Sequence, residues 1–184
     1  MINKSGTLKC LFNAIKYVEI GHAWFYHHQI PDFIAMAQAV PDTTIILDHF
    51  GGPLGIGSYA GQSDAVFEAW SRAFAPLADC PNVYCKLGGI NMKVNGYGWH
   101  LQSKPPGSDE LVDATERYYH RAIDVFGPER CMFESNFPVD KESCSYTVLW
   151  NAFKKMASRY TAEERSGLLK DNAERCYRLT SDTP

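Results

Sequence analysis

The sequence repeats one local pattern: a short apolar segment, a loop that contains glycine or proline, and then residues with helical spacing. Three apolar segments are clear and a weaker one precedes them, in the order 20–26, 43–49, 82–88 and 130–136. Helices are predicted over about 31–40, 63–77, 108–126, 145–158 and 172–179, and Thr161 with Glu164 forms a capping box for a further short one. Strands that alternate with helices of ten or more residues are typical of a parallel sheet, so the predicted class is α/β.

Length and composition narrow the class of protein. The chain has 184 residues, of which 45% are hydrophobic and 21% charged, so residues 1–184 are expected to form a single globular domain, with 1–20 fitting the pattern poorly. Its net charge of −3 excludes a polyanion-binding role, so no nucleic acid is expected. No apolar run approaches the ~20 residues of a membrane helix, and no leader-like start is evident, which predicts a cytoplasmic protein away from membranes.

Cysteines are spread along the chain without any CxxC pair. The six are expected to be free, mostly buried thiols rather than disulfides or ligands of a structural zinc ion.

Polar side chains stand at the ends of the three clear strands. Asp48-His49 comes before Gly51-Gly52-Pro53, Lys86 comes before Gly88-Gly89, and Glu134 comes before Asn136-Phe137-Pro138. Loops at the carboxyl ends of parallel strands share one rim of a sheet, where ligands bind. Alternation puts Glu134 on the face of Asn136 and Lys86 on the face of Gly88. If the sheet belongs to a barrel, alternation points Asp48 away from the barrel lumen. Glu134 is therefore either a catalytic carboxylate or the partner of Lys86 in an ion pair.

These strand ends, together with Gly127-Pro128-Glu129-Arg130 ahead of the last strand, resemble the amidohydrolase-related family of metal-dependent TIM-barrel hydrolases over about Trp24 to Leu179. The resemblance implies a partial TIM (β/α)8 barrel, namely barrel strands five to eight with their flanking helices. A closed barrel usually takes ~250 residues, so the N-terminal half is absent from this chain. An open sheet of this kind predicts a homo-oligomer or a complementary half-barrel as partner.

The resemblance also implies a site. His49 matches a strand-six histidine that binds metal or substrate, and Asn136 stands where the family usually has aspartate. A neutral amide is a poor metal ligand and no general base, so Glu134 is the candidate to supply the missing carboxylate. The expected catalytic residues are therefore His49, Glu134 and Asn136. The expected substrate-binding residues are Tyr26, His27, Gln29, Lys86, Trp99 and His100.

The family implies a divalent metal, zinc or manganese, bound in part by His49. No His-x-His occurs in the sequence, so a complete metal site within this chain is not expected. The predicted function is a hydrolase that attacks the carbonyl of a small carboxylated ester, lactone or amide with water. The alternatives are a non-catalytic or truncated half-barrel that packs with another chain, and a decarboxylase of the same superfamily.

Overall fold

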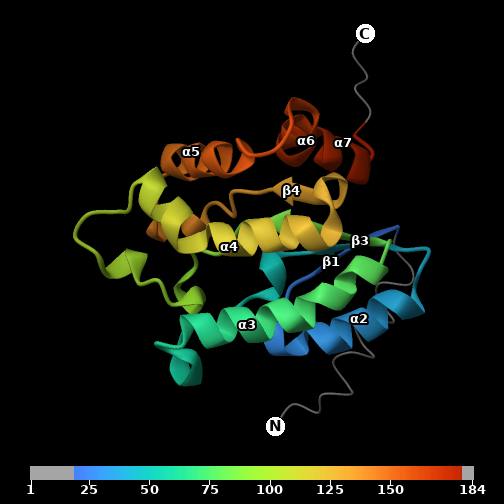
Figure 1. Ribbon diagram of the computed structural model, residues 1–184, viewed down its shortest axis with the longest axis horizontal. Helices are drawn as coiled ribbons and strands as arrows, with labels where there is room; N and C mark the ends of the chain where they lie inside the picture. Colours follow the sequence, from blue (N-terminus) through green and yellow to red (C-terminus); the bar gives the residue numbers. More distant parts are fainter. Residues whose placement is uncertain (1–18, 180–184) are drawn as a thin grey trace.

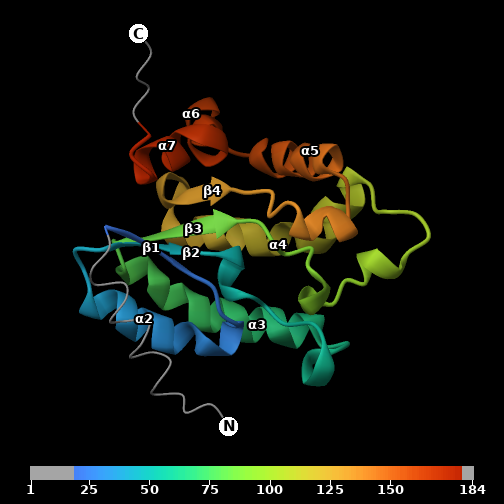
Figure 2. The same cartoon turned by 180° about the vertical axis from the view of Figure 1, so that it is seen from behind.

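A computed structural model describes residues 19–179 of the protein. Its centre is one parallel sheet in which the strands lie side by side in chain order (Figures 1 and 2). The strands are β1 (Ile20–Ala23), β2 (Thr44–Leu47), β3 (Val83–Leu87) and β4 (Cys131–Phe133). The predicted partial α/β barrel with four parallel strands is confirmed, and the weaker first strand is present but ends three residues earlier than predicted.

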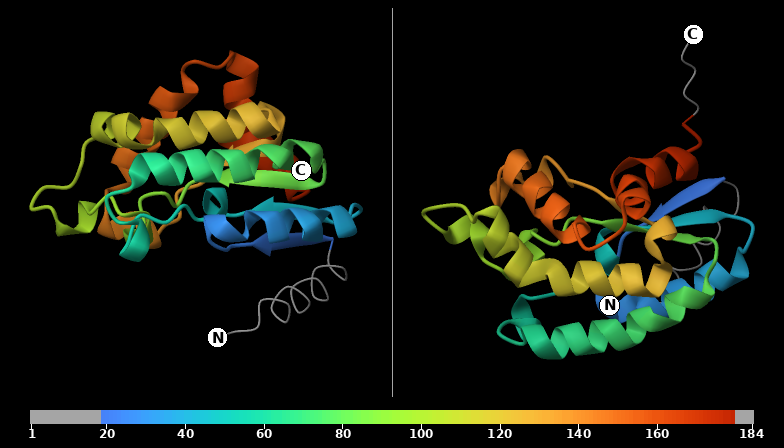
Figure 3. Two further views of the ribbon diagram at one scale, coloured as in Figure 1. Left: turned by 60° about the horizontal axis from the view of Figure 1, so that its bottom comes forward. Right: turned by 45° about the horizontal axis from the view of Figure 1, so that its top comes forward.

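Helices follow each strand. Three of them connect the strands and cover one face of the sheet, as Figure 3 shows: α2 (Ile30–Ala39), α3 (Ser63–Phe74) and α4 (Ser108–Phe126). The segment after β4 contains α5 (Tyr146–Ala157), α6 (Ala162–Ser166), the π-helix η9 (Gly167–Asp171) and α7 (Asn172–Cys176). The predicted helices are found within a few residues, and the capping box of Thr161 and Glu164 is confirmed by both of its hydrogen bonds.

The two faces of the sheet carry different side chains. On the outer face, Leu47 and Cys85 pack with the helices in the main core, which includes the fully buried Trp70 and Phe74. Partner positions in the register, such as His22 with Ile46 and Lys86 with Met132, lie on the other, inner face. There Ile46 and Met132 form a second, smaller cluster with Cys176 of α7.

The described cysteines follow this division. All five are buried and free, and Cys85 and Cys131 lie on the face opposite Lys86, as alternation predicts. The sixth, Cys10, lies outside the described residues.

The loop after β2 is anchored to the core before it reaches the rim. Phe50 is fully buried, and the indole Nε1 of Trp70 on α3 donates a hydrogen bond of 2.7 Å to its carbonyl oxygen. Because a buried carbonyl needs such a partner, this bond fixes the backbone right after His49. Within residues 19–179, no helix is both long and apolar enough to cross a membrane.

Candidate active site

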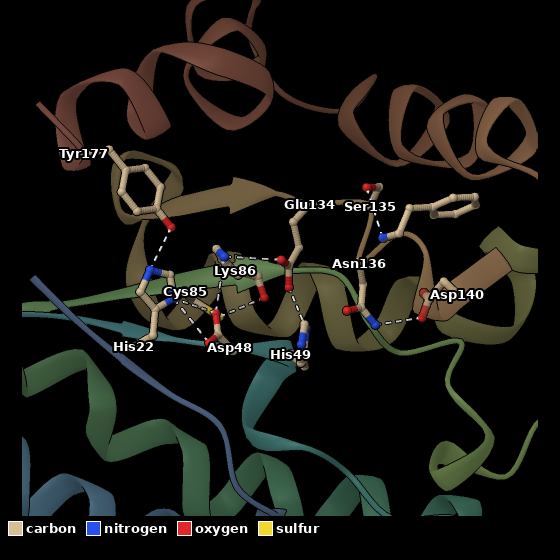
Figure 4. Close-up of polar contacts among 11 residues, drawn as sticks. His22, Asp48, His49, Cys85, Lys86, Glu134, Ser135, Asn136, Asp140 and Tyr177 are labelled. Carbon is tan, nitrogen blue, oxygen red and sulfur yellow. Dashed lines mark hydrogen bonds and ion pairs between the residues drawn. The ribbon is translucent and has the colours of Figure 1, made fainter. Parts of the chain in front are cut away.

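One continuous line of polar side chains crosses the inner face of the sheet and ends at its carboxyl rim. Figure 4 shows these side chains pointing toward one another from all four strands and from the end of α7. We call this line the inner-face row; in order, its members are Tyr177, His22, Asp48, Lys86, Glu134 and His49.

Lys86 lies at the centre of the row. Its Nζ is 3.5 Å from Asp48 Oδ1 and 3.4 Å from Glu134 Oε2, and all three side chains are at most 21% exposed. Burial lowers the pKa of Lys86, but the two carboxylates outweigh it, so the pKa is raised and the ammonium stays charged. The ion pair between Lys86 and Glu134, one of the two interpretations open from sequence, is therefore present.

His49 and Glu134 form the rim end of the row. His49 Nδ1 lies 2.6 Å from Glu134 Oε1, with the side chains 15% and 16% exposed. The two atoms lack the alignment of a linear hydrogen bond, so we treat the contact mainly as one between charges. Burial lowers the pKa of His49, yet Glu134 and then Asp48 raise it more, and the net pKa is raised. Burial raises the pKa of Glu134, but His49 and Lys86 lower it further, so Glu134 is ionised.

The backbone after β2 explains which side chains reach the inner face. Asp48 continues the alternation of Ile46, so it points inward and contacts His22 and Lys86. The prediction that Asp48 points away from the lumen was wrong. His49 would face outward by alternation, but its φ of 56° breaks the extended chain and turns the imidazole back to the inner face. Strand alternation assumes extended backbone, so it could not predict the left-handed conformation of His49.

Two glycines make room for the rim pair. A Cβ atom at Gly88 would lie 2.5 Å from Glu134 Cγ, and one at Gly89 would lie 2.6 Å from His49 Cγ and closer still to Nδ1. Real Cβ atoms do not approach other atoms this closely. The Gly88-Gly89 pair at the end of β3 thus lets His49, which follows β2, meet Glu134, which follows β4, across the strand between them.

Asn136 lies beside this pair but is held by a residue that the sequence did not single out. Its backbone has a φ of 53°, and its Nδ2 donates a 2.8 Å hydrogen bond to Oδ1 of Asp140. Asp140 belongs to the 3-10 helix η8 (Val139–Glu142) and is completely buried. Burial raises the pKa of Asp140 to about 6, although Asn136 and His49 act in the opposite direction. The spacing of four residues from Asn136 was the available signal.

Tyr26, His27 and Gln29 lie in the loop between β1 and α2. Gln29 Oε1 accepts a hydrogen bond from the backbone N–H of Tyr26, and buried His27 accepts one at Nδ1 from the backbone of Leu54. Burial, followed by the charge of His28, lowers the pKa of His27, which favours the neutral ring needed to accept that bond. Among the described residues, no hydrogen bond or ion pair links these three side chains to His49 or Glu134.

Trp99 and His100 lie in the 3-10 helix η6 (Trp99–Leu101) of the long loop after β3. Trp99 stacks on Tyr97 with ring centroids 5.7 Å apart, while Trp99 Nε1 and His100 Nδ1 are buried without a partner among the described residues. A cavity of about 140 Å³ lies nearby between loops and helices, lined by Leu54 and Asn95 among others. None of the expected site residues lines it.

The side chains of Asp48, Glu134 and His49 are not arranged to bind a metal ion. The oxygens of Asp48 and Glu134 converge on the ammonium of Lys86, and His49 directs Nδ1 at Glu134 rather than at a shared point. Across residues 19–179, no group of three or more His, Cys, Asp or Glu side chains is arranged to hold a metal. An ammonium already occupies the place between the carboxylates, so we derive no step through a metal.

The fold, with its four parallel strands and connecting helices, is that of a segment of a TIM barrel. The family model described as Amidohydrolase matches residues 20–179, and the chain belongs to that family. The uncharacterized protein y4mH of Sinorhizobium fredii is 39% identical over 154 residues. An L-fucono-1,5-lactonase of Burkholderia multivorans is 32% identical over 155 residues. Each match covers 84% of this chain but only 45% and 49% of the relative, so the chain spans about half their length.

Solved structures agree with the partial barrel. An amidohydrolase of Burkholderia multivorans, solved with bound zinc, superposes with a TM-score of 0.82 at 26% identity. The match covers 98% of this chain and 62% of that one. A hydrolase described as a putative 2-pyrone-4,6-dicarboxylic acid hydrolase from Pseudomonas putida shares the fold, with a TM-score of 0.57 at 20% identity. A zinc ion in one neighbour supports a divalent metal in the family, without providing this chain with a complete ligand set.

Proposed function

We propose that the chain is a hydrolase of small esters or lactones in which His49 activates the carbonyl and Glu134 serves as the carboxylate. The observation that carries this proposal is the 2.6 Å contact between His49 and Glu134 at the strand ends. Burial lowers the pKa of His49, but the contact with Glu134 raises it more, which favours the protonated imidazole. The lactonase relatives support the same class of reaction.

The proposed reaction uses the two ends of the imidazole separately. Nδ1 faces Glu134, which leaves Nε2 to donate to the substrate carbonyl oxygen as charge develops on it. Water attacks the carbonyl carbon and gives one proton to Glu134. The bond between carbonyl carbon and ring oxygen then breaks, and the leaving oxygen takes the Nε2 proton of His49. Exchange with solvent restores both groups, so the net reaction is addition of one water to form an acid and an alcohol.

The row also bears on the substrate. Lys86 was expected to bind substrate, but Asp48 and Glu134 already neutralise its charge. A neutral lactone therefore suits this rim better than a carboxylated one. The first probe is L-fucono-1,5-lactone, followed by unsubstituted δ-valerolactone and by a carboxylated lactone of the same ring size.

Hydrolysis is measured by the release of acid from each lactone with the purified chain and with its His49→Gln variant. We expect loss of a general acid to lower kcat/KM by at least a hundredfold. His120→Gln on α4 is the matched control, because the His120 side chain is 14% exposed against 15% for His49 and lies in a different part of the fold. Absence of hydrolysis by folded chain, or equal rates for His49→Gln and His120→Gln, would refute the proposal.

A second candidate is a half-barrel, comprising residues 1–184 as one domain, that packs with another copy or with a complementary half. One observation favours it: within residues 19–179, β1 and β4 are the edge strands of the sheet, each paired on one side only, and the chain spans about half the length of its relatives. Open edges of a sheet favour association. Size-exclusion chromatography with light scattering distinguishes the candidates, because a stable monomer that hydrolyses lactones contradicts the need for a partner.

A further inference from the structure

The Asn136–Asp140 pair stands apart from the inner-face row. Asn136 Nδ2 donates to Asp140 Oδ1 at 2.8 Å, and the backbone N–H of Asp140 donates to the carbonyl oxygen of Asn136 at 3.1 Å. Two bonds therefore close a ring between the end of β4 and η8. Asp140 is fully buried, while Asn136 is only partly buried and reaches the rim.

The chemistry of the two side chains fixes the direction of the amide. An ionised carboxylate accepts hydrogen bonds and cannot donate them, so Asn136 must offer its NH2 to Asp140. Its carbonyl oxygen then has to point the other way. Figure 4 shows Asn136 Oδ1 on the side of His49 and Glu134, with the nitrogen toward Asp140.

The surroundings of Asp140 suit it to hold the Asn136 amide in this orientation. Its side chain is fully buried, and the side chains of Asn136 and Asn91 both lower its pKa by hydrogen bonding. A fully buried carboxylate is costly to keep unless such partners hold it. The amide of Asn136 is therefore one of the groups that keep Asp140 in place.

We propose that Asn136 and Asp140 act as one unit, in which Asp140 is a positioning residue that locks the Asn136 amide with its oxygen facing the His49–Glu134 pair. In this unit the carboxylate is that of Asp140, one helical turn after the strand end. The residue at the rim is Asn136, whose amide oxygen is a neutral hydrogen-bond acceptor. This inference rests on the proposed hydrolase function only in what the acceptor does: Asn136 Oδ1 accepts a hydrogen bond from the attacking water and aims it at the substrate.

The unit predicts how positions 136 and 140 respond to exchange of their side chains. Asn136→Asp alone places two carboxyl groups at hydrogen-bond distance, where their repulsion opposes ionisation of both. Adding Asp140→Asn restores one amide and one carboxylate with the hydrogen bond reversed. We expect Asn136→Asp to lower both the unfolding midpoint and kcat/KM, the latter about tenfold or more, and the double variant to recover most of both losses.

A second arm separates positioning from packing. Asp140→Ala removes the acceptor, and we expect kcat to fall about tenfold with KM changed less than twofold, at a temperature where the variant is fully folded. In 15N-labelled protein, the Asn136 side-chain amide signal, assigned by its loss in Asn136→Asp, should shift strongly in Asp140→Ala. Glu142→Gln, on the same η8 helix but with an exposed side chain, is the control and should leave both readouts unchanged.

The outcomes are distinct from those that test the hydrolase. An unshifted Asn136 amide signal in Asp140→Ala, or a double variant no more stable than Asn136→Asp, overturns the unit whether or not lactone is hydrolysed. A shifted signal with rescued stability supports the unit even in a chain that hydrolyses none of the lactones, in which case only the hydrolase proposal fails.

Discussion

The contact between Gly89 and His49 yields a sharp prediction. Gly89 has a φ of +72°, and a Cβ there would lie 2.6 Å from His49 Cγ. Gly89→Ala therefore has two costs: about 1 kcal/mol for left-handed backbone at alanine, and about 2 kcal/mol for driving His49 off Glu134. The imidazole also loses the neighbour that raises its pKa, so the His49 pKa should fall.

Gly61→Ala isolates the second cost. Gly61 has a φ of +71°, almost the same as Gly89, but nothing lies within 4 Å of its would-be Cβ. Both variants should be destabilised by the left-handed backbone at alanine, and only Gly89→Ala should be destabilised further by the displaced imidazole. We expect the free energies of unfolding from urea titration to differ by about 2 kcal/mol.

Two-dimensional NMR of the histidine rings measures the second consequence. The His49 pKa should drop in Gly89→Ala and stay at its raised value in Gly61→Ala. If the two variants are equally destabilised and the His49 pKa is the same in both, then the packing of Gly89 against the imidazole does not hold the rim pair together.

Two further predictions concern the charges. Lys86→Met strands the carboxylates of Asp48 and Glu134 and should cost about 2–4 kcal/mol at pH 7, whereas Lys155→Met, which breaks an exposed pair, should cost less than 1 kcal/mol; equal urea midpoints would contradict this. The His49–Glu134 contact should stabilise most between about pH 4.5 and 6.5. The raised pKa of His49 means that its contribution is complete below the unfolded value of 6.5 and is lost as pH rises through the folded value. The lowered pKa of Glu134 means that its contribution is present above 4.5 and is lost as pH falls through the folded value. The stability difference between the native chain and His49→Gln should therefore shrink from pH 6 to pH 9, and a constant difference would count against the contact.

The sequence predicts the fold well because the fold depends on periodic patterns. Strand and helix spacing, together with alternation, place Lys86 and Glu134 on one face without knowledge of any tertiary contact. The ion pair between them follows because neighbouring parallel strands bring the same face into register. The parallel order of the four strands follows from the intervening helices.

Local departures from periodicity account for what the sequence could not predict. Asp48 and His49 both reach the inner face, because His49 adopts left-handed backbone and strict alternation between the two neighbours fails. Asp140 was missed because its contact with Asn136 depends on a helical turn after β4 that the sequence analysis did not predict. Tyr177 was missed because it reaches the row from α7, which lies 155 residues from its partner His22.

The inner-face row implies that substitutions of its members are energetically coupled. Each interior member contacts two others, so removing one leaves a neighbour with an unbalanced charge, and the effect of a second substitution depends on the first. Effects of substitutions along the row should be strongly non-additive. A second substitution that restores the balance between the carboxylates and the ammonium of Lys86 should therefore recover part of what the first one loses.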